Sequence, residues 1–319
     1  MDQRVARVIR AVIGQRHANS DERNPQLNGI RKFSRDGHTL YHGDCIDVFS
    51  SEIADGSVDL IFADPPYNIG KRFANFTDKW TTDAVYADWC KTWLDSCIAK
   101  LSPIGSMYVM TSTQCMPYLD LYLRDRISIV SRIVWHYDSS GVQAKQKYGS
   151  LYEPILFCAK DPNNYTFNTE DILVEARTGA KRKLIDYRKP VPAAYSTTKV
   201  PGNVWFIPRV RFRMPEYEDH PSQKPEALLE RIILASSNPN DLILDPFAGA
   251  FTTCAVADRL KRRSIGIERE LDYVKIGLRR LEVCDELDGE RLRPPDKVYK
   301  RRNANGARIP EPADQPRLF

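Results

Sequence analysis

Two polar turns, each preceded by a short apolar run, constrain the fold of this chain more than any other feature. The run VDLIFA at 58–63 leads into Asp-Pro-Pro-Tyr at 64–67, and DLIL at 241–244 leads into Asp-Pro-Phe-Ala-Gly at 245–249. Apolar runs of this length are typical of strands buried in a parallel sheet. Because open α/β sheets bind ligands at the carboxyl ends of their strands, we expect both turns to border one site.

The rest of the sequence organises around these turns. Strand-like and helix-like runs alternate over 38–160 and again over 214–284, which predicts a Rossmann-like, mostly parallel sheet with helices on both faces. The polar, basic and aromatic stretch 161–213 interrupts that alternation, and we interpret it as an inserted region, although a solvated excursion without a special role fits its composition equally well. Residues 1–37 form an N-terminal extension with a predicted short amphipathic helix, and 285–319 a charged tail that we expect to be disordered.

Bulk composition narrows the environment and the partners. Lys plus Arg number 47 and Asp plus Glu 42, a modest excess that suits a polyanionic partner without demonstrating one. The seven cysteines include no C-x-x-C pair, which argues against a disulfide framework and a zinc site and favours a reducing, cytoplasmic location. The sequence has neither a signal-peptide core nor an apolar stretch long enough to span a membrane.

The second turn has the features of a nucleotide-binding loop. Gly249 permits a tight turn and close approach of a ligand to the backbone, and the helix that follows offers unpaired N–H groups. Glu268 ends the next predicted strand about 20 residues beyond Asp245, the separation found between a nucleotide loop and its ribose-binding acid. No G-x-G-x-x-G occurs at this turn, which disfavours a nicotinamide cofactor.

The motifs and their order resemble those of a known family. ADPPYN first, HPSQKP at 220–225, and DPFAGAFTT last resemble the β class of S-adenosylmethionine-dependent DNA amino methyltransferases. Segments such as SRIVWHYDSSGVQAK and KVPGNVW look especially like the YhdJ-type solitary adenine methyltransferases, which act on ATGCAT. The resemblance implies transfer of a methyl group from S-adenosylmethionine to N6 of a flipped-out adenine in double-stranded DNA, with 38–160 as the catalytic half and 214–284 as the cofactor-binding half. A homodimer is possible.

The resemblance also assigns the first turn as catalytic, through Asp64, Pro65, Pro66 and Tyr67. The lone pair of the adenine amine is delocalised into the ring, so catalysis must localise it. The Asp64 carboxylate and the Pro65 carbonyl are the predicted acceptors of the two amine hydrogens, and Tyr67 the predicted ring that stacks on the flipped base. We expect no metal, because the positive sulfur already activates the methyl group.

Cofactor residues follow from the same resemblance. The methionine part of the cofactor is expected near Asp245, Phe247, Gly249 and Thr252, its ribose at Glu268 and its adenine near Asp44. Lys224 is expected at the cofactor end of the pocket, although a solvated lysine at a helix start is nearly as good an interpretation. The family pattern D-P-F-x-G-x-G-T is broken by Phe251 at the second glycine position, which puts the loop geometry in question.

DNA binding is predicted for the insert together with the loop 139–150. The candidate phosphate-binding side chains are Arg177, Lys181, Arg182, Lys183, Arg188 and Lys189. Three alternatives remain open: a cytosine-N4 DNA methyltransferase, an RNA methyltransferase, and a non-catalytic DNA-binding module. By the same resemblance, Asp rather than Ser before Pro-Pro is more typical of adenine-N6 enzymes than of cytosine-N4 enzymes.

Overall fold

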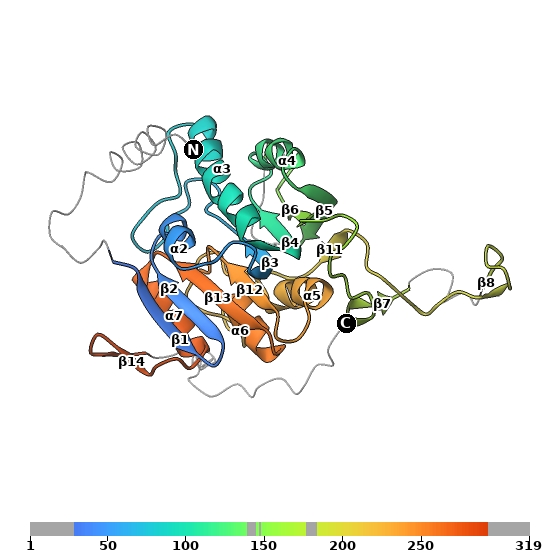
Figure 1. The fold of residues 1–319 in the computed structure, drawn as a ribbon. Helices are drawn as coiled ribbons and strands as arrows, with labels where there is room; N and C mark the ends of the chain where they lie inside the picture. The colour runs from blue at the N-terminus through green and yellow to red at the C-terminus, as the bar shows by residue number, and fades with distance from the viewer. Residues whose placement is uncertain (1–28, 139–144, 147, 177–183, 293–319) are drawn as a thin grey trace, which may run out of the picture.

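The computed structural model describes residues 29–138, 145–146, 148–176 and 184–292, which fold around one large sheet (Figure 1). The order of its strands is β1-β2-β13-β12-β3-β4-β6-β5-β11. Every neighbouring pair is parallel except those of β1 with β2 and of β6 with β4 and β5. The strands are β1 Arg31–Arg35, β2 His38–His42, β3 Val58–Ala63, β4 Leu101–Met110, β5 Ser128–His136, β6 Tyr152–Ala159, β11 Val204–Phe206, β12 Leu242–Asp245 and β13 Arg263–Glu268.

Helices cover both faces of this sheet, because alternate residues of its strands point to opposite sides. Ile61 and Ala63 pack in one core with α2, α3 and α4, whereas Leu60 and Phe62 pack in another with α5 and α6. A third cluster joins α6 and α7 to β2. The helices are α2 Cys45–Ser51, α3 Asp83–Lys100, α4 Met116–Arg124, α5 Glu226–Ser236, α6 Thr252–Arg259 and α7 Leu271–Arg280. The predicted fold class is confirmed.

The sheet reverses its winding between β12 and β3. The chain passes from β12 through α6 to β13 on one side, and from β3 through α3 to β4 on the other, while β12 and β3 are paired neighbours. Such a reversal leaves a crevice at the carboxyl ends of the two central strands. The two turns that dominate the sequence follow these two strands, so the fold brings them together.

Three parts of the predicted organisation differ in the structure. β1 and β11 belong to the main sheet, although β1 falls within the predicted N-terminal extension and β11 within the predicted insert. The expectation of disorder was wrong for 285–292, where β14 Glu286–Leu287 and β15 Glu290–Arg291 form a hairpin. Leu287 is buried in the third cluster, which includes α7, and Lys275 binds Glu290 at 2.5 Å. Composition alone does not predict these contacts. The predicted N-terminal helix and residues 293–319 lie outside the described residues.

The insert forms a thin arm that projects from the domain (Figure 1). Beyond the short 3-10 helix Glu170–Ile172, β7 Val174–Glu175 pairs with β10 Thr198–Lys199, and β8 Ile185–Asp186 pairs with β9 Ala193–Ala194. The turn 187–192 therefore closes the arm. Among the residues that the structure describes, no helix combines the length and apolar character needed to cross a membrane.

Candidate active site

Four acidic side chains lie at the carboxyl ends of four consecutive parallel strands. Asp44 lies two residues beyond β2, Glu268 ends β13, Asp245 ends β12, and Asp64 follows β3. Neighbouring strands are about 4.8 Å apart, so this row extends over roughly 15 Å along one edge of the sheet. An edge of this kind suits a ligand that combines a positive centre with hydroxyl groups.

Asp245 organises the loop that follows β12. Its Oδ1 accepts a hydrogen bond from the Phe247 N–H (3.0 Å) and its Oδ2 accepts one from the Thr253 hydroxyl (2.5 Å). Burial raises the pKa of the Asp245 carboxyl to about 7, and the neighbouring charges of Asp64 and Glu268 act in the same direction. Thr253 was not predicted as a site residue.

Glu268 and His220 hold the same loop from two sides. The Glu268 carboxylate accepts hydrogen bonds from the Gly249 N–H (2.9 Å) and the Glu270 N–H (2.8 Å). Gly249 has φ of +50°, and a Cβ built there would lie 2.9 Å from the His220 ring. Only glycine fits both this backbone conformation and this contact. His220 opens the HPSQKP segment, so that motif packs directly against the loop after β12.

Phe251, which departs from the family pattern, has a backbone conformation that suits glycine and a side chain that packs away from the loop. Its backbone has φ of +56° and ψ of 32°, the left-handed conformation that a glycine at this position would adopt easily. The side chain is completely buried against Gly266 and Gly277, where a built Cβ would lie 2.7 Å and 2.5 Å from its ring. The ring therefore occupies space that two other glycines leave, on the core side of the loop.

The remaining predicted cofactor residues have varied surroundings. Asp44 caps α2 by accepting a hydrogen bond from the Ile46 N–H (2.9 Å), and burial raises the pKa of its carboxyl. The Phe247 ring packs edge-on against Trp93, with centroids 5.1 Å apart. The Thr252 hydroxyl accepts a hydrogen bond from Arg280 of α7 (3.1 Å). The cofactor roles of these residues stay predictions.

Asp64 belongs to a buried cluster of four polar side chains. The Tyr67 hydroxyl lies 2.6 Å from Asp64 Oδ1 and 2.8 Å from Glu153 Oε2. Lys224 Nζ lies 2.8 Å from Asp64 Oδ2 and 3.4 Å from Glu153 Oε2. Between 9% and 15% of the Lys224, Asp64 and Glu153 side chains is exposed. Pro65, also buried, separates Asp64 from Pro66 and Tyr67 on a turn whose main chain is fixed by Asp78, which accepts a hydrogen bond from the Tyr67 N–H.

The cluster perturbs the ionisation of its members. Burial raises the pKa of the Asp64 carboxyl although the Lys224 charge opposes this. For Glu153 burial acts in the same direction, but Lys224 and the Tyr67 hydroxyl outweigh it, and the pKa of Glu153 is lowered. The two carboxylates likewise outweigh the burial of Lys224 and raise its pKa. The lysine is therefore a cation in the folded protein.

The structure thus places Lys224 differently from the sequence-based expectation. Its ammonium lies between the carboxylates of Asp64 and Glu153, with the Tyr67 ring centroid 5.1 Å away. Sequence reasoning did not select Glu153 as a site residue, although the segment that contains it, YEPILFCAK, is among those that resemble the YhdJ-type enzymes. The proximity of Glu153 to Asp64 becomes apparent only in the folded sheet, where β6 lies two strands from β3.

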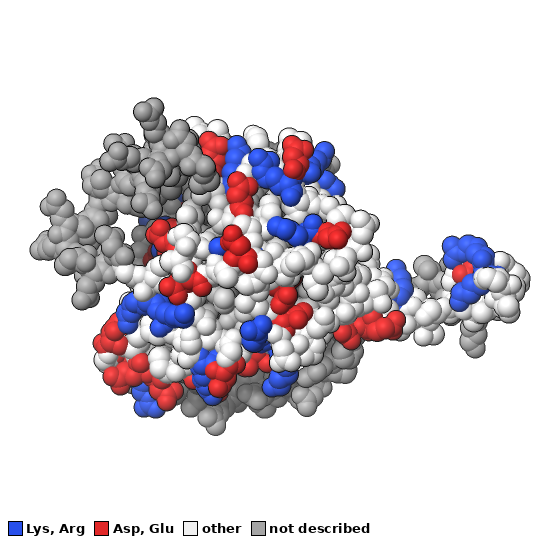
Figure 2. All heavy atoms as spheres, viewed as in Figure 1, with Lys and Arg blue, Asp and Glu red and all other residues white. Residues whose placement is uncertain are grey.

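Of the predicted DNA-binding side chains, only Arg188 and Lys189 fall within the described residues. Both are exposed on the turn that closes the arm, and Arg188 binds Asp186 at 2.9 Å. Figure 2 shows basic side chains gathered at the end of the arm, while the visible face of the main domain is mixed in charge. Arg177, Lys181, Arg182 and Lys183 lie outside the described residues.

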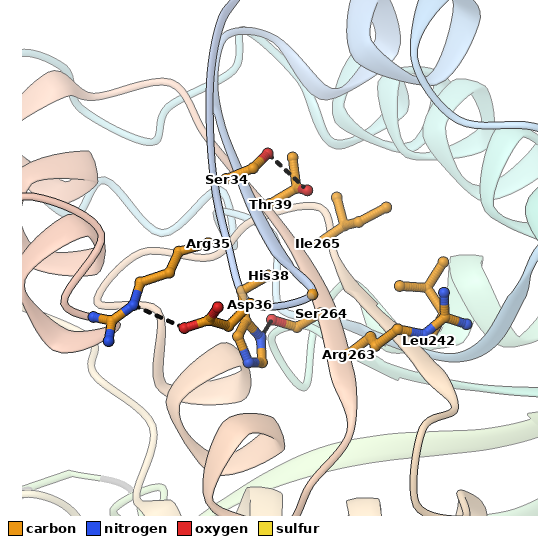
Figure 3. A pocket seen from close by; sticks show the side chains of 10 residues that line it. Ser34, Arg35, Asp36, His38, Thr39, Leu242, Arg263, Ser264 and Ile265 are labelled. Carbon is orange, nitrogen blue, oxygen red and sulfur yellow. Dashed lines mark hydrogen bonds and ion pairs between the residues drawn. The ribbon is translucent and has the colours of Figure 1, made fainter.

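Two cavities lie outside the row of acids, one at the opposite edge of the sheet and one beside the segment after β11. One of about 450 Å³ is lined by residues including Arg35, His38, Arg263 and Ser264 (Figure 3). It lies at the amino ends of β2 and β13, opposite the four acids. The other, of about 320 Å³, is lined by Asp138, Phe206, Pro208, Arg209, Arg211 and Met214. Within the described ranges, no group of three or more His, Cys, Asp or Glu residues could hold a metal ion.

Comparison with known proteins agrees with this geometry. A family model described as DNA methylase matches residues 58–279. The DNA adenine methyltransferase YhdJ of Escherichia coli (strain K12) is 56% identical over 274 residues, 86% of this chain and 92% of that protein. The type II methyltransferase M.HpaI of Haemophilus parainfluenzae is 33% identical over 250 residues, 76% of each. In fold, the PvuII DNA methyltransferase (cytosine-N4-specific) is similar, with a TM-score of 0.60 at 18% identity over 79% of this chain and 90% of that chain.

Proposed function

The chain belongs to the DNA methylase family and is a site-specific DNA adenine methyltransferase that uses S-adenosylmethionine; from that premise we propose that it methylates N6 of an adenine flipped out of duplex DNA within ATGCAT. The observation that carries the proposal is the pairing of β12 with β3. Because of this pairing, the loop after β12 and the Asp64 turn lie at neighbouring strand ends, which supports a methyl donor bound beside its acceptor.

The cofactor site is assigned to the loop after β12. S-adenosylmethionine supplies a methyl group already activated by a positively charged sulfur. Asp245 and the loop it organises would accept the methionine part, Glu268 the ribose hydroxyls, and Asp44 the adenine. The acidic edge favours a cationic ligand, and Gly249 lets the ligand approach the backbone closely.

The target amine is assigned to Asp64 and the Pro65 carbonyl. Two acceptors for its two hydrogens would draw the nitrogen lone pair out of conjugation and direct it at the neighbouring strand end. Asp64 would also take the proton that the amine loses after transfer. The Tyr67 ring, fixed at its hydroxyl and at its N–H, would stack against the flipped base.

Duplex DNA is assigned to the side of the cluster where basic groups gather. Arg209 lies 5.0 Å from the centroid of the Tyr137 ring, whose hydroxyl lies 3.4 Å from Glu153. The cavity that Arg209 lines therefore adjoins the catalytic cluster. Arg188 and Lys189 on the arm would bind phosphates farther along the duplex. A homodimer and a cytoplasmic, nucleoid-associated location complete the proposal.

The test is methyl transfer from labelled S-adenosylmethionine to duplex DNA with and without ATGCAT, followed by identification of the methylated nucleoside. We expect N6-methyladenine only when the site is present. N6-methyladenine in both duplexes would discard the target sequence and keep the reaction. N4-methylcytosine, or a preference for structured RNA in competition, would replace the substrate, and DNA binding without transfer would indicate a non-catalytic module.

A further inference from the structure

Glu153 is the one acid of the buried cluster that lies outside the three motifs ADPPYN, HPSQKP and DPFAGAFTT. It lies near the start of β6, and its Oε2 is within 2.8 Å of the Tyr67 hydroxyl and 3.4 Å of Lys224 Nζ. Its other oxygen, Oε1, lies 3.4 Å from the Tyr137 hydroxyl. Both carboxylate oxygens are therefore engaged, and the side chain is fixed in orientation by groups from three other segments.

Lys224 is shared between Glu153 and Asp64. A single ammonium cannot neutralise two carboxylates, so the ionised cluster keeps a net negative charge in a buried place. The other charged groups that act on the two acids are Lys71, Arg209 and Asp245, from the loop after Tyr67, the segment after β11 and the end of β12. Without Glu153, the ammonium would pair with Asp64 alone.

We propose that Glu153 is a positioning residue for methyl transfer: by sharing Lys224 with Asp64 and anchoring the Tyr67 hydroxyl, it leaves Asp64 the charge and orientation needed to accept the hydrogens of the target amine. This inference rests on the proposed function, because it concerns the same turn. Glu153 touches neither reacting atom. It acts through Asp64 and Tyr67.

The proposed role of Glu153 predicts a change in the pH dependence of the transfer rate. The nearby Glu153 charge raises the pKa of Asp64, whereas Lys224 and the Tyr67 hydroxyl lower it. Transfer requires an ionised Asp64, so the rate falls as the pH drops through the pKa of that carboxyl. Removing the Glu153 charge lowers this pKa and moves the acid limb of the rate profile to lower pH, while weakening Asp64 as an acceptor.

The experiment is the single-turnover rate of transfer as a function of pH for Glu153→Gln, with cofactor and DNA saturating. We expect a rate about tenfold to a hundredfold lower on the plateau, an acid limb displaced to lower pH, and unchanged S-adenosylmethionine affinity by calorimetry. Tyr67→Phe keeps the ring and removes the hydroxyl, and its acid limb should move the opposite way. Glu286→Gln, at an exposed position of β14, should match the parent.

The outcomes separate this inference from the proposed function. A parent that transfers no methyl group to DNA contradicts the proposed function. An active parent with a Glu153→Gln variant of equal rate and equal acid limb overturns only the role of Glu153. A slower variant whose acid limb stays in place also overturns it, since that result describes a structural defect. If Glu153→Gln does not bind cofactor, Glu153→Asp replaces it, and its acid limb must move in the same direction by a smaller amount. An acid limb of Glu153→Asp at the same pH as that of the parent overturns the role of Glu153.

Discussion

The loop after β12 and the turn after β3 lie on neighbouring strands, but they are stabilised in different ways. The first is held largely from within one βαβ unit: Asp245 binds Phe247 and Thr253, and Glu268 binds Gly249. At the second turn, Asp64 and Tyr67 depend on two distant residues, Glu153 and Lys224. The cofactor loop is therefore encoded locally, whereas the catalytic cluster exists only when β3, β6 and the segment before α5 are assembled.

The difference predicts opposite consequences for mutation. A change in the cofactor loop should alter ligand affinity and local stability together, because the same side chains shape the backbone and the pocket. A change in the catalytic cluster should alter the rate with little effect on cofactor affinity, because its members touch each other more than they touch the loop. The predictions below test this separation.

The largest expected effect is that of Asp64→Ala on transfer. Loss of the carboxylate removes the acceptor of the target amine, and we expect the single-turnover rate to fall by about a thousandfold or more. S-adenosylmethionine affinity, measured by calorimetry, should stay within about twofold of the parent, a difference under 0.5 kcal/mol. Asp125→Asn, an exposed position beyond α4, serves as the control. Retained turnover in Asp64→Ala would remove that residue from catalysis.

Phe251→Gly should produce the largest loss of stability. Emptying the buried ring site costs about 3–5 kcal/mol, and relief of the left-handed backbone returns about 1–2 kcal/mol. We expect a net loss of roughly 1–4 kcal/mol in chemical denaturation. Cofactor affinity of the folded variant should persist, because the backbone at this position already has a left-handed conformation that glycine adopts easily.

A double-mutant cycle with Gly277→Ala sharpens that prediction. In the parent, the added Cβ would lie 2.5 Å from the Phe251 ring, so Gly277→Ala should destabilise by about 1–3 kcal/mol. In the Phe251→Gly background the same methyl group enters vacated space, and the substitution should be neutral or stabilising. Additive effects would show that Phe251 and the glycine at 277 do not share this space.

The parts of the site that the sequence predicts are those encoded locally, and the parts it does not predict are those assembled from distant segments. The strands before both turns, the alternation of strands and helices around them, and the position of Asp64 beside the loop after β12 follow from apolar runs and from the motifs. Glu153 and the placement of Lys224 did not follow, because Glu153 lies 86 residues from Tyr67 and Lys224 lies 160 residues (224 − 64) from Asp64 in sequence. Composition also failed for 285–292, where a buried Leu287 and the Lys275–Glu290 pair order a charged segment.

Gly249→Ala tests the locally encoded loop. The substitution adds the cost of a left-handed alanine and a contact with the His220 ring, together roughly 2 kcal/mol in stability, and should weaken cofactor affinity about tenfold. Gly56→Ala is the matched control, because Gly56 also has positive φ (+69°) but no atom within 4 Å of its built Cβ. That variant should show the backbone cost alone, with unchanged affinity. Equal effects of the two substitutions would argue against the role of His220 behind the loop.

The smallest expected effect is a pH dependence of cofactor binding that originates at Asp245. The pKa of this carboxyl is about 7 in the folded protein, above its ordinary value of 3.8, so the folded state holds a proton that the unfolded state loses. The stability it contributes is complete below pH 4 and declines as the pH rises toward 7. A cationic ligand favours the ionised carboxyl, so cofactor affinity should rise over the same interval and level off above about pH 7. Calorimetry should find this trend in the parent and lose it in Asp245→Asn, whose side-chain oxygen can still accept the Phe247 N–H. A trend that persists in Asp245→Asn would assign the proton to another group and leave Asp245 with the loop alone.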